Sequence, residues 1–151
     1  MKIIHTIILF LFIIFCNAQT NNLDEIRRTY LESPQSVRNI NKLISMCEGH
    51  KKDSTIYAYR AAANIMLIKY KYNPLNKLKL FTDYSRKLDL IVINNLNNIE
   101  IRLLRYCLQK QSPRFLGYND NLELDYQFII ENIDDQSKDL QDFVNSTLKA
   151  L

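Results

Sequence analysis

The chain has 151 residues, of which 47% are hydrophobic and 24% charged, and its formal net charge is +4. This composition is typical of a globular protein and excludes a disordered or collagen-like chain. Two glycines, three prolines and three cysteines are too few for the turns of an all-β barrel or for a disulfide-rich scaffold.

Residues 1–18 have the pattern of a secretory signal peptide. Lys2 precedes an apolar run at residues 3–15, and small residues at Cys16 and Ala18 mark a cleavage site. The run is too short for a spanning helix, which needs about 20 residues. We therefore expect an exported protein, periplasmic or extracellular, with no stable membrane span and a single helical domain over 19–151. An uncleaved anchor is the alternative.

Apolar residues then recur at helical spacing in about seven segments, from the stripe Leu23, Ile26 and Tyr30 to the stripe Leu140, Phe143 and Val144. Short polar turns separate the segments, and residues typical of helix starts follow most turns. The predicted starts are, in chain order, Ser33-Pro34, Asp53, Asn73-Pro74, Asn97 with Glu100, Asp120 with Glu123, and Asp134 or Asp135. Gly49 is expected to end the second helix in a left-handed conformation.

These elements predict an all-α fold of stacked antiparallel hairpins, either a tetratricopeptide-like α-solenoid or an irregular bundle. The predicted caps Asp53 and Asn97 lie 44 residues apart, whereas the tetratricopeptide period is 34. The likeness to that repeat is therefore one of hairpin stacking and not of consensus. The last helix is expected to form the terminal cap of the stack. Cys47 and Cys107 lie on apolar stripes, so we favour two buried thiols, and a disulfide formed in the oxidising compartment is the alternative. In a linear stack a whole hairpin would separate the two cysteines, which would then be too far apart to bridge.

Three segments carry a family resemblance: NPLNKLKLF at 73–81, NNIEIRLLRYCLQ at 97–109 and SPRFLGYNDNLELDYQFI at 112–129. Together with the export segment they resemble small exported proteins of the Bacteroidota with unassigned function. The resemblance extends from about residue 54 onward. It implies a helical, tetratricopeptide-like fold outside the cytoplasm, and it implies no reaction.

Few residues of the expected mature chain are typical of catalysis. His50 is its one histidine, and it lies beside two lysines in a turn that ends a helix, where its charge would complement the helix dipole. Cys47, His50 and Asp53 are spaced for a metal, but Gly49 breaks the helix between them and no fourth ligand is near. Since no glycine-rich phosphate loop is present either, we expect neither an enzyme nor a cofactor or metal site.

Charge is unevenly distributed along the chain. Residues 50–119 contain 13 basic and four acidic residues, whereas residues 120–151 contain two basic and eight acidic residues. The two regions could neutralise each other within the molecule, which we favour, or the middle region could present a basic surface to an anionic partner.

The sequence RFLGYND at 114–120 is the best local candidate for function. Phe115 and Leu116 are expected to turn inward. The candidate binding residues at one end of the stack are Arg102, Arg105, Arg114, Tyr118 and Asn119. The alternative is that they only fix the loop, the two arginines pairing with a carboxylate such as Asp120 or Asp125.

The sequence thus predicts a non-catalytic exported protein that binds a protein or peptide, and the basic middle region would suit an anionic one. Nucleic acid is not expected as a partner, because no recognised binding motif is present. The alternative is a binder of a small apolar or anionic ligand held between helices, with a pocket lined by Tyr59, Met66, Phe81 and Tyr106.

Overall fold

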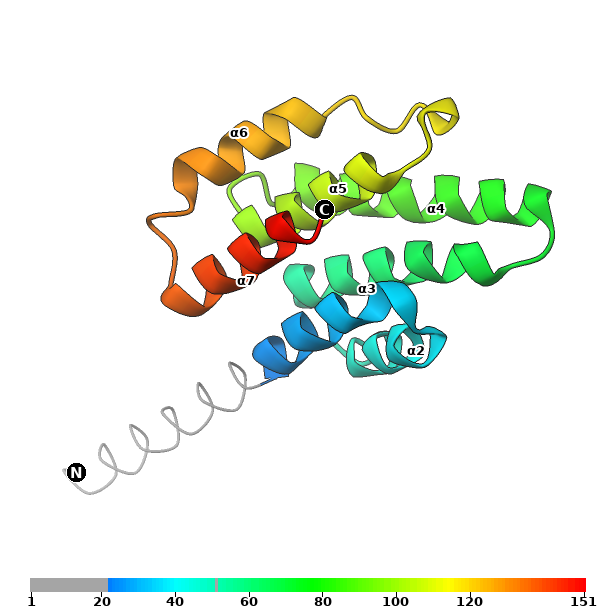
Figure 1. Cartoon of the computed structure of the whole chain (residues 1–151), viewed down its shortest axis with the longest axis horizontal. Helices are drawn as coiled ribbons and strands as arrows, with labels where there is room; N and C mark the ends of the chain where they lie inside the picture. Colours follow the sequence, from blue (N-terminus) through cyan, green and yellow to red (C-terminus); the bar gives the residue numbers. More distant parts are fainter. Residues whose placement is uncertain (1–21, 51) are drawn as a thin grey trace, which may run out of the picture.

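A computed structural model describes residues 22–50 and 52–151 (Figure 1). The predicted signal peptide lies outside these residues. Within them the chain is all-α, as predicted, with seven α-helices and no strand. Residues 22–32 form the first helix, and it is followed by α2 (Val37–Met46), α3 (Ser54–Leu67), α4 (Pro74–Ile93), α5 (Ile99–Gln111), α6 (Leu122–Asn132) and α7 (Lys138–Lys149). Three short 3-10 turns join them: η1 (Ser33–Gln35), η2 (Ile68–Tyr70) and η3 (Arg114–Leu116).

Two predicted helix starts are confirmed by their hydrogen bonds. The Asp53 carboxylate accepts from the backbone N–H groups of Thr55 and Ile56 at 2.9 and 3.1 Å. Asn73 caps α4 in the same way, with Pro74 as the first helical residue. Because these caps depend only on neighbouring residues, they can be read directly from the sequence.

Other predicted starts were wrong by a few residues. Ser33 and Pro34 form η1, and the side chain of Ser36 caps α2. Asn98 replaces Asn97 as the cap of α5, accepting from the N–H of Ile101 at 3.0 Å. Helices α6 and α7 begin after Asn121 and Ser137, neither of which makes a side-chain cap, so the acidic residues predicted to start them lie outside the cap positions.

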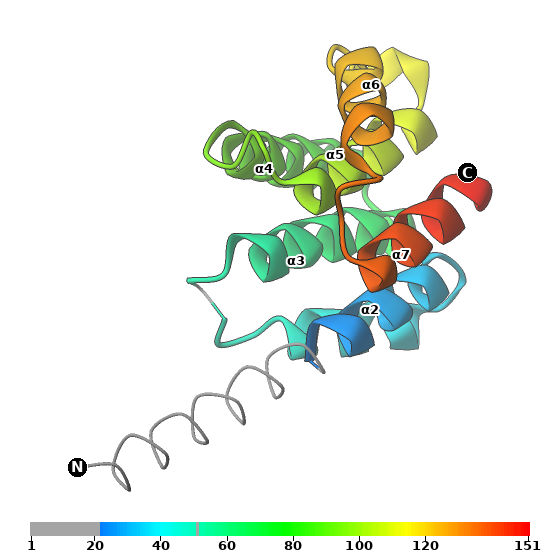
Figure 2. The ribbon, with the colours of Figure 1, turned by 90° about the vertical axis from the view of Figure 1, so that its left-hand side faces the viewer.

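The helices lie in layers, with α3 near the centre (Figure 2). Helix α3 contacts α2, α4 and α5. Its segment Ala61–Ala63 is buried throughout, and such small side chains let neighbouring helices approach closely. The described residues share one hydrophobic core cluster, to which all seven helices contribute.

The first and last helices meet on one side of α3. Tyr30 of the first helix lies edge-on to Tyr59 of α3, with ring centroids 5.3 Å apart, and both rings contact Phe143 of α7 at 6.2 Å. Helix α7 therefore packs back onto the start of the described chain instead of extending the stack. This arrangement is typical of an irregular bundle, one of the two predicted architectures.

A buried carboxylate joins the first helix to the middle of the chain. Glu100 of α5 accepts from Arg27 through both carboxylate oxygens, at 2.8 and 2.7 Å, and from the Tyr59 hydroxyl at 2.6 Å. Burial, reinforced by the Glu100 charge, raises the pKa of Tyr59 well above its usual range. The phenol therefore stays protonated and donates to Glu100, which fixes three helices to one another.

Candidate binding groove

Arg102 and Arg105, two of the predicted binding residues, are held by one buried carboxylate. Asp125 of α6 is 0% exposed and accepts from Arg102 Nε at 2.7 Å and from Arg105 Nε and Nη2 at 2.7 and 2.9 Å. The side chain of Arg102 also lies over the ring of Phe128, with its guanidinium carbon 4.1 Å from the ring centroid. Both arginines thus hold α6 against α5 and are not free to bind a partner.

Tyr118, a third predicted binding residue, belongs to the same network. Its hydroxyl donates to Asp89 of α4 at 3.0 Å, and Arg105 Nη1 lies 3.6 Å from the same carboxylate. Burial raises the pKa of Tyr118, and the charge of Asp89 raises it further. The network fixes the loop between α5 and α6 to α4. This agrees with the alternative stated above, in which these residues only fix the loop.

The remaining candidates, Arg114 and Asn119, are exposed to solvent. The expectation that Phe115 points inward was wrong, because its side chain is 86% exposed. Leu116 is half-buried, and Gly117 adopts a positive φ of +60°. The turn at Gly117 brings Tyr118 back to the protein while η3 carries Phe115 outward.

Phe115 lies beside a groove that arises from a difference in helix length. Helix α4 has 20 residues and α5 has 13, which correspond to about 30 and about 20 Å at 1.5 Å per residue. The two helices are joined by the turn at 94–98 and run antiparallel, so the first two turns of α4 extend past the end of α5 (Figure 1). Pro113 stops α5 there, since proline does not continue a helix.

This surface, which we call the tip groove, has a volume of about 610 Å³ and is walled by the end of α3, the start of α4 and the chain from α5 into η3. Twelve of its 16 lining residues are apolar: Pro34, Ile65, Met66, Ile68, Pro74, Leu75, Leu78, Phe81, Leu108, Pro113, Phe115 and Leu116. The other four are Lys69, Lys77, Gln111 and Ser112. Leu75 is 78% exposed and Leu78 52%. Such a cluster of exposed large apolar residues usually marks an interaction site.

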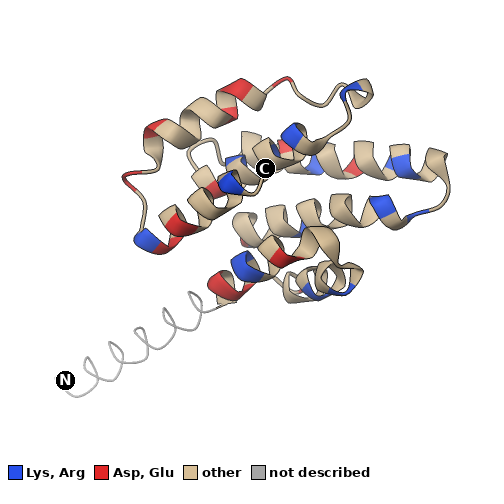
Figure 3. Cartoon of the chain, viewed as in Figure 1, with Lys and Arg blue, Asp and Glu red and all other residues tan. Residues whose placement is uncertain are grey.

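The rim of the tip groove is cationic. Lys69 and Lys77 line it, and Lys110 and Arg114 adjoin it in the chain; we call these four the rim cations. No Asp or Glu occurs at residues 54–82 or 101–119, and none of the rim cations forms an ion pair within the described part of the chain. Figure 3 shows the acidic residues gathered mainly on α6, α7 and the first helix, away from this end. The tip groove therefore combines an apolar floor with uncompensated positive charge.

The predicted small-ligand pocket does not exist as one cavity among the described residues. Tyr59 is buried in the core and Tyr106 stacks on Tyr126, with ring centroids 5.5 Å apart. Met66 and Phe81 do line a hollow, but it is the tip groove.

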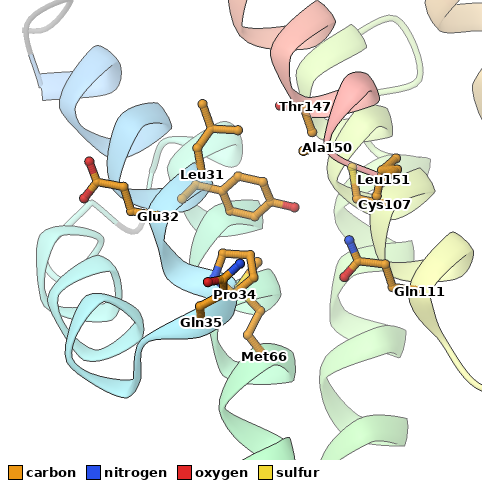
Figure 4. A pocket seen from close by; sticks show the side chains of 11 residues that line it. Leu31, Glu32, Pro34, Gln35, Met66, Cys107, Gln111, Thr147, Ala150 and Leu151 are labelled. Carbon is orange, nitrogen blue, oxygen red and sulfur yellow. The ribbon is translucent and has the colours of Figure 1, made fainter.

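A second hollow of about 450 Å³ lies between the first helix and the end of α7 (Figure 4). Tyr30 and Cys107 both line it, and Met66 and Gln111 border both this hollow and the tip groove. Cys47 and Cys107 are both free and buried, as predicted. Burial raises the pKa of each thiol to about 12, so Cys107 offers this hollow a protonated, weakly reactive sulfur.

His50 lies exposed at the end of α2, where one ring nitrogen is 3.2 Å from the carbonyl oxygen of Glu48. Residues 22–50 and 52–151 contain no group of three or more His, Cys, Asp or Glu side chains placed to hold a metal ion. Nor does this part of the chain contain a helix long and apolar enough to cross a membrane.

Comparisons of the chain with models of known protein families, with curated proteins and with solved structures found no match.

Proposed function

We propose that the protein is a non-catalytic binding protein that acts after export and holds an apolar segment of a partner protein in the tip groove. The observation that carries the proposal is the exposed apolar face on the first half of α4, where Leu75 and Leu78 line the same groove as Phe115. Within the core, the same helix buries Leu88, Ile91 and Val92 against its neighbours. The end of α4 is already packed against neighbouring helices, and a partner segment would pack against the start of α4 in the same way.

Of the residues predicted to bind a partner, only Arg114 supports the tip groove as the binding site. Arg102, Arg105 and Tyr118 are used within the molecule, whereas Arg114 is exposed and lies in the chain between two residues that line the tip groove, Pro113 and Phe115. Binding energy at protein interfaces comes mainly from a few buried side chains with large apolar area. Phe115 is the residue of the tip groove best placed to supply such an anchor.

Selection of displayed random peptides on the purified protein tests the proposal. The counter-selection target is the double variant Leu78→Ser/Phe115→Ser, and the matched control is Leu124→Ser, which removes an exposed leucine (64%) from α6. We expect peptides that bind the wild type and Leu124→Ser alike and bind the double variant at least tenfold more weakly. Peptides that bind all three proteins equally, or no enrichment at all, would refute the proposal.

A small amphiphile with an anionic head is the second candidate. It is favoured by the volume of the tip groove, which lies within the range of about 300–1,000 Å³ typical of small-molecule sites, and by the rim cations. A fatty acid such as palmitate, titrated into wild type and Leu78→Ser/Phe115→Ser, distinguishes it. Saturable binding lost in the variant, with no peptide enriched, would establish this candidate in place of the first.

A further inference from the structure

We infer that the segment held by the tip groove is a short amphipathic α-helix with acidic residues on its polar side. This inference rests on the proposed function and names the conformation and charge of the partner segment. It follows from three features of the tip groove: its polar groups, its position beside α4, and its charge.

The scarcity of polar groups favours a helix over an extended peptide. Of the 16 lining residues only Gln111, Ser112 and two lysines carry polar side chains. Lys77 Nζ already donates to the carbonyl oxygen of Lys69 at 3.2 Å, and Lys69 Nζ donates to that of Pro34. An extended segment would bury backbone N–H and C=O groups without partners, which is costly. A helix satisfies these groups internally.

The described residues also contain no strand whose edge could pair with an extended peptide. Peptide recognition by strand addition needs such an edge, whereas recognition of a helix needs an apolar groove. The tip groove supplies the second requirement.

The tip groove lies where a further helix could pack against α3 and α4, beyond the end of α5. Helix α5 contacts both α3 and α4, and it ends at Gln111. Beyond that point the end of α3 and the start of α4 continue side by side, and no other helix of the described residues lies between them (Figure 1). The seven residues by which α4 exceeds α5 correspond to about 10 Å, or about two turns. A partner helix of two to three turns would continue the layer to which α5 belongs.

The charge of the rim selects the polar side of the partner. No carboxylate of residues 22–50 or 52–151 lies within 4 Å of the rim cations, so an acidic partner gains attraction without breaking an ion pair found there. A basic helix with the same apolar residues would meet four like charges. Electrostatic complementarity of this kind sets specificity and association rate.

A membrane surface fits these observations less well. The apolar residues of the tip groove come from three parts of the chain and line a depression, whereas binding to a bilayer interface is typical of a single amphipathic helix that presents one apolar face. Vesicles therefore serve as a competing probe in the test.

Three synthetic peptides of about 14 residues test the inference. All carry leucine at positions i, i+3, i+7 and i+10; the first has glutamate on its polar side, the second has lysine, and the third is the glutamate peptide with two interior prolines. Fluorescence anisotropy measures their binding to the purified protein. We expect the glutamate peptide to bind at least tenfold more tightly than each of the other two.

Two pairs of variants locate the binding. Leu78→Ser/Phe115→Ser should weaken the glutamate peptide at least tenfold, and Leu124→Ser should leave it unchanged. Lys110→Glu/Arg114→Glu should weaken it at least tenfold relative to Lys52→Glu/Lys149→Glu, a control with the same change of net charge at exposed positions away from the tip groove. Circular dichroism confirms that all variants remain folded, which is expected because each substituted side chain is exposed or lies at the rim.

The outcomes separate this inference from the proposed function. If the lysine or proline peptide binds as tightly as the glutamate peptide, and Leu78→Ser/Phe115→Ser weakens that binding, the inference is overturned but the proposed peptide binding stands. Equal loss in both charge variants would show non-specific attraction and would overturn the inference as well. If no peptide binds but palmitate or vesicles of anionic phospholipid do, and Leu78→Ser/Phe115→Ser abolishes it, both the inference and the proposed function fail.

Discussion

Replacement of Asp125 should be among the most destabilising substitutions in the protein. Its carboxylate is 0% exposed and accepts three hydrogen bonds of 2.7–2.9 Å from two guanidinium groups. The side chains of Arg102 and Arg105 are themselves only 14% and 7% exposed. Asp125→Ala therefore leaves two largely buried cations without a partner, apart from the weaker 3.6 Å contact of Arg105 with Asp89.

The expected loss is about 4 kcal/mol, because breaking a buried ion pair by removing one partner typically costs about 3–5 kcal/mol. For a domain of this size that corresponds to a fall in Tm of about 15 °C. Urea and thermal unfolding followed by far-UV circular dichroism measure both quantities. The control Asp120→Ala, at an exposed position five residues earlier, should change stability by no more than about 0.5 kcal/mol.

A triple variant tests whether the loss of stability comes from unpaired buried charge or from lost packing. Arg102→Met/Arg105→Met/Asp125→Leu removes all three charges and keeps most of the side-chain volume, so it should unfold within about 2 kcal/mol of the wild type. The reasoning is refuted if Asp125→Ala costs less than about 1 kcal/mol, or if the triple variant is no more stable than Asp125→Ala.

Three further predictions concern single groups. The pKa values of about 12 for Cys47 and Cys107 predict that a thiol reagent at about pH 8 modifies the native protein at least about 100-fold more slowly than the urea-unfolded protein. Because the unfolded thiols ionise first, the free energy of unfolding should also fall as pH rises from about 9 toward 12; comparable rates in both states would contradict the assignment. Tyr59→Phe removes a hydrogen bond to a carboxylate and should cost about 2 kcal/mol in urea unfolding, whereas Tyr57→Phe, at a side chain 39% exposed, serves as the near-neutral control. Gly117→Ala should cost about 1 kcal/mol through its φ of +60° alone, since no atom lies within 4 Å of the added Cβ; Gly117→Asn should cost less, and the reverse order would argue against the left-handed turn.

Local signals predicted much of the fold. The helical spacing of apolar residues gave the right number of helices, and Asp53 and Asn73 cap helices through neighbouring N–H groups. The pairing of Arg102 and Arg105 with Asp125 was also among the alternatives read from the sequence. Arg102 and Arg105 lie three residues apart and so share a helix face, and Asp125 lies on the next predicted helix, which made it a possible partner.

Features set by distant contacts were not predictable in the same way. Phe115 was expected to be buried because apolar residues usually are, but only the position of η3 relative to α4 decides that it faces solvent. The sequence does contain two signals for the tip groove. One is the uninterrupted helical stretch after Pro74, which is longer than the stretch stopped by Pro113, and the other is the absence of acidic residues from 54–82 and 101–119. Neither signal shows how the helix after Pro74 and the helix before Pro113 pack together to form the groove.

The contact of Phe143 with Tyr30 and Tyr59 has a consequence for how the molecule loses its structure. In an open solenoid each repeat touches only its neighbours, and the ends fray independently. Here the two extremes of the described chain share a single aromatic cluster, so loosening either one removes support from the other. Amide protons of the first helix and of α7 should therefore exchange with solvent in one concerted opening event.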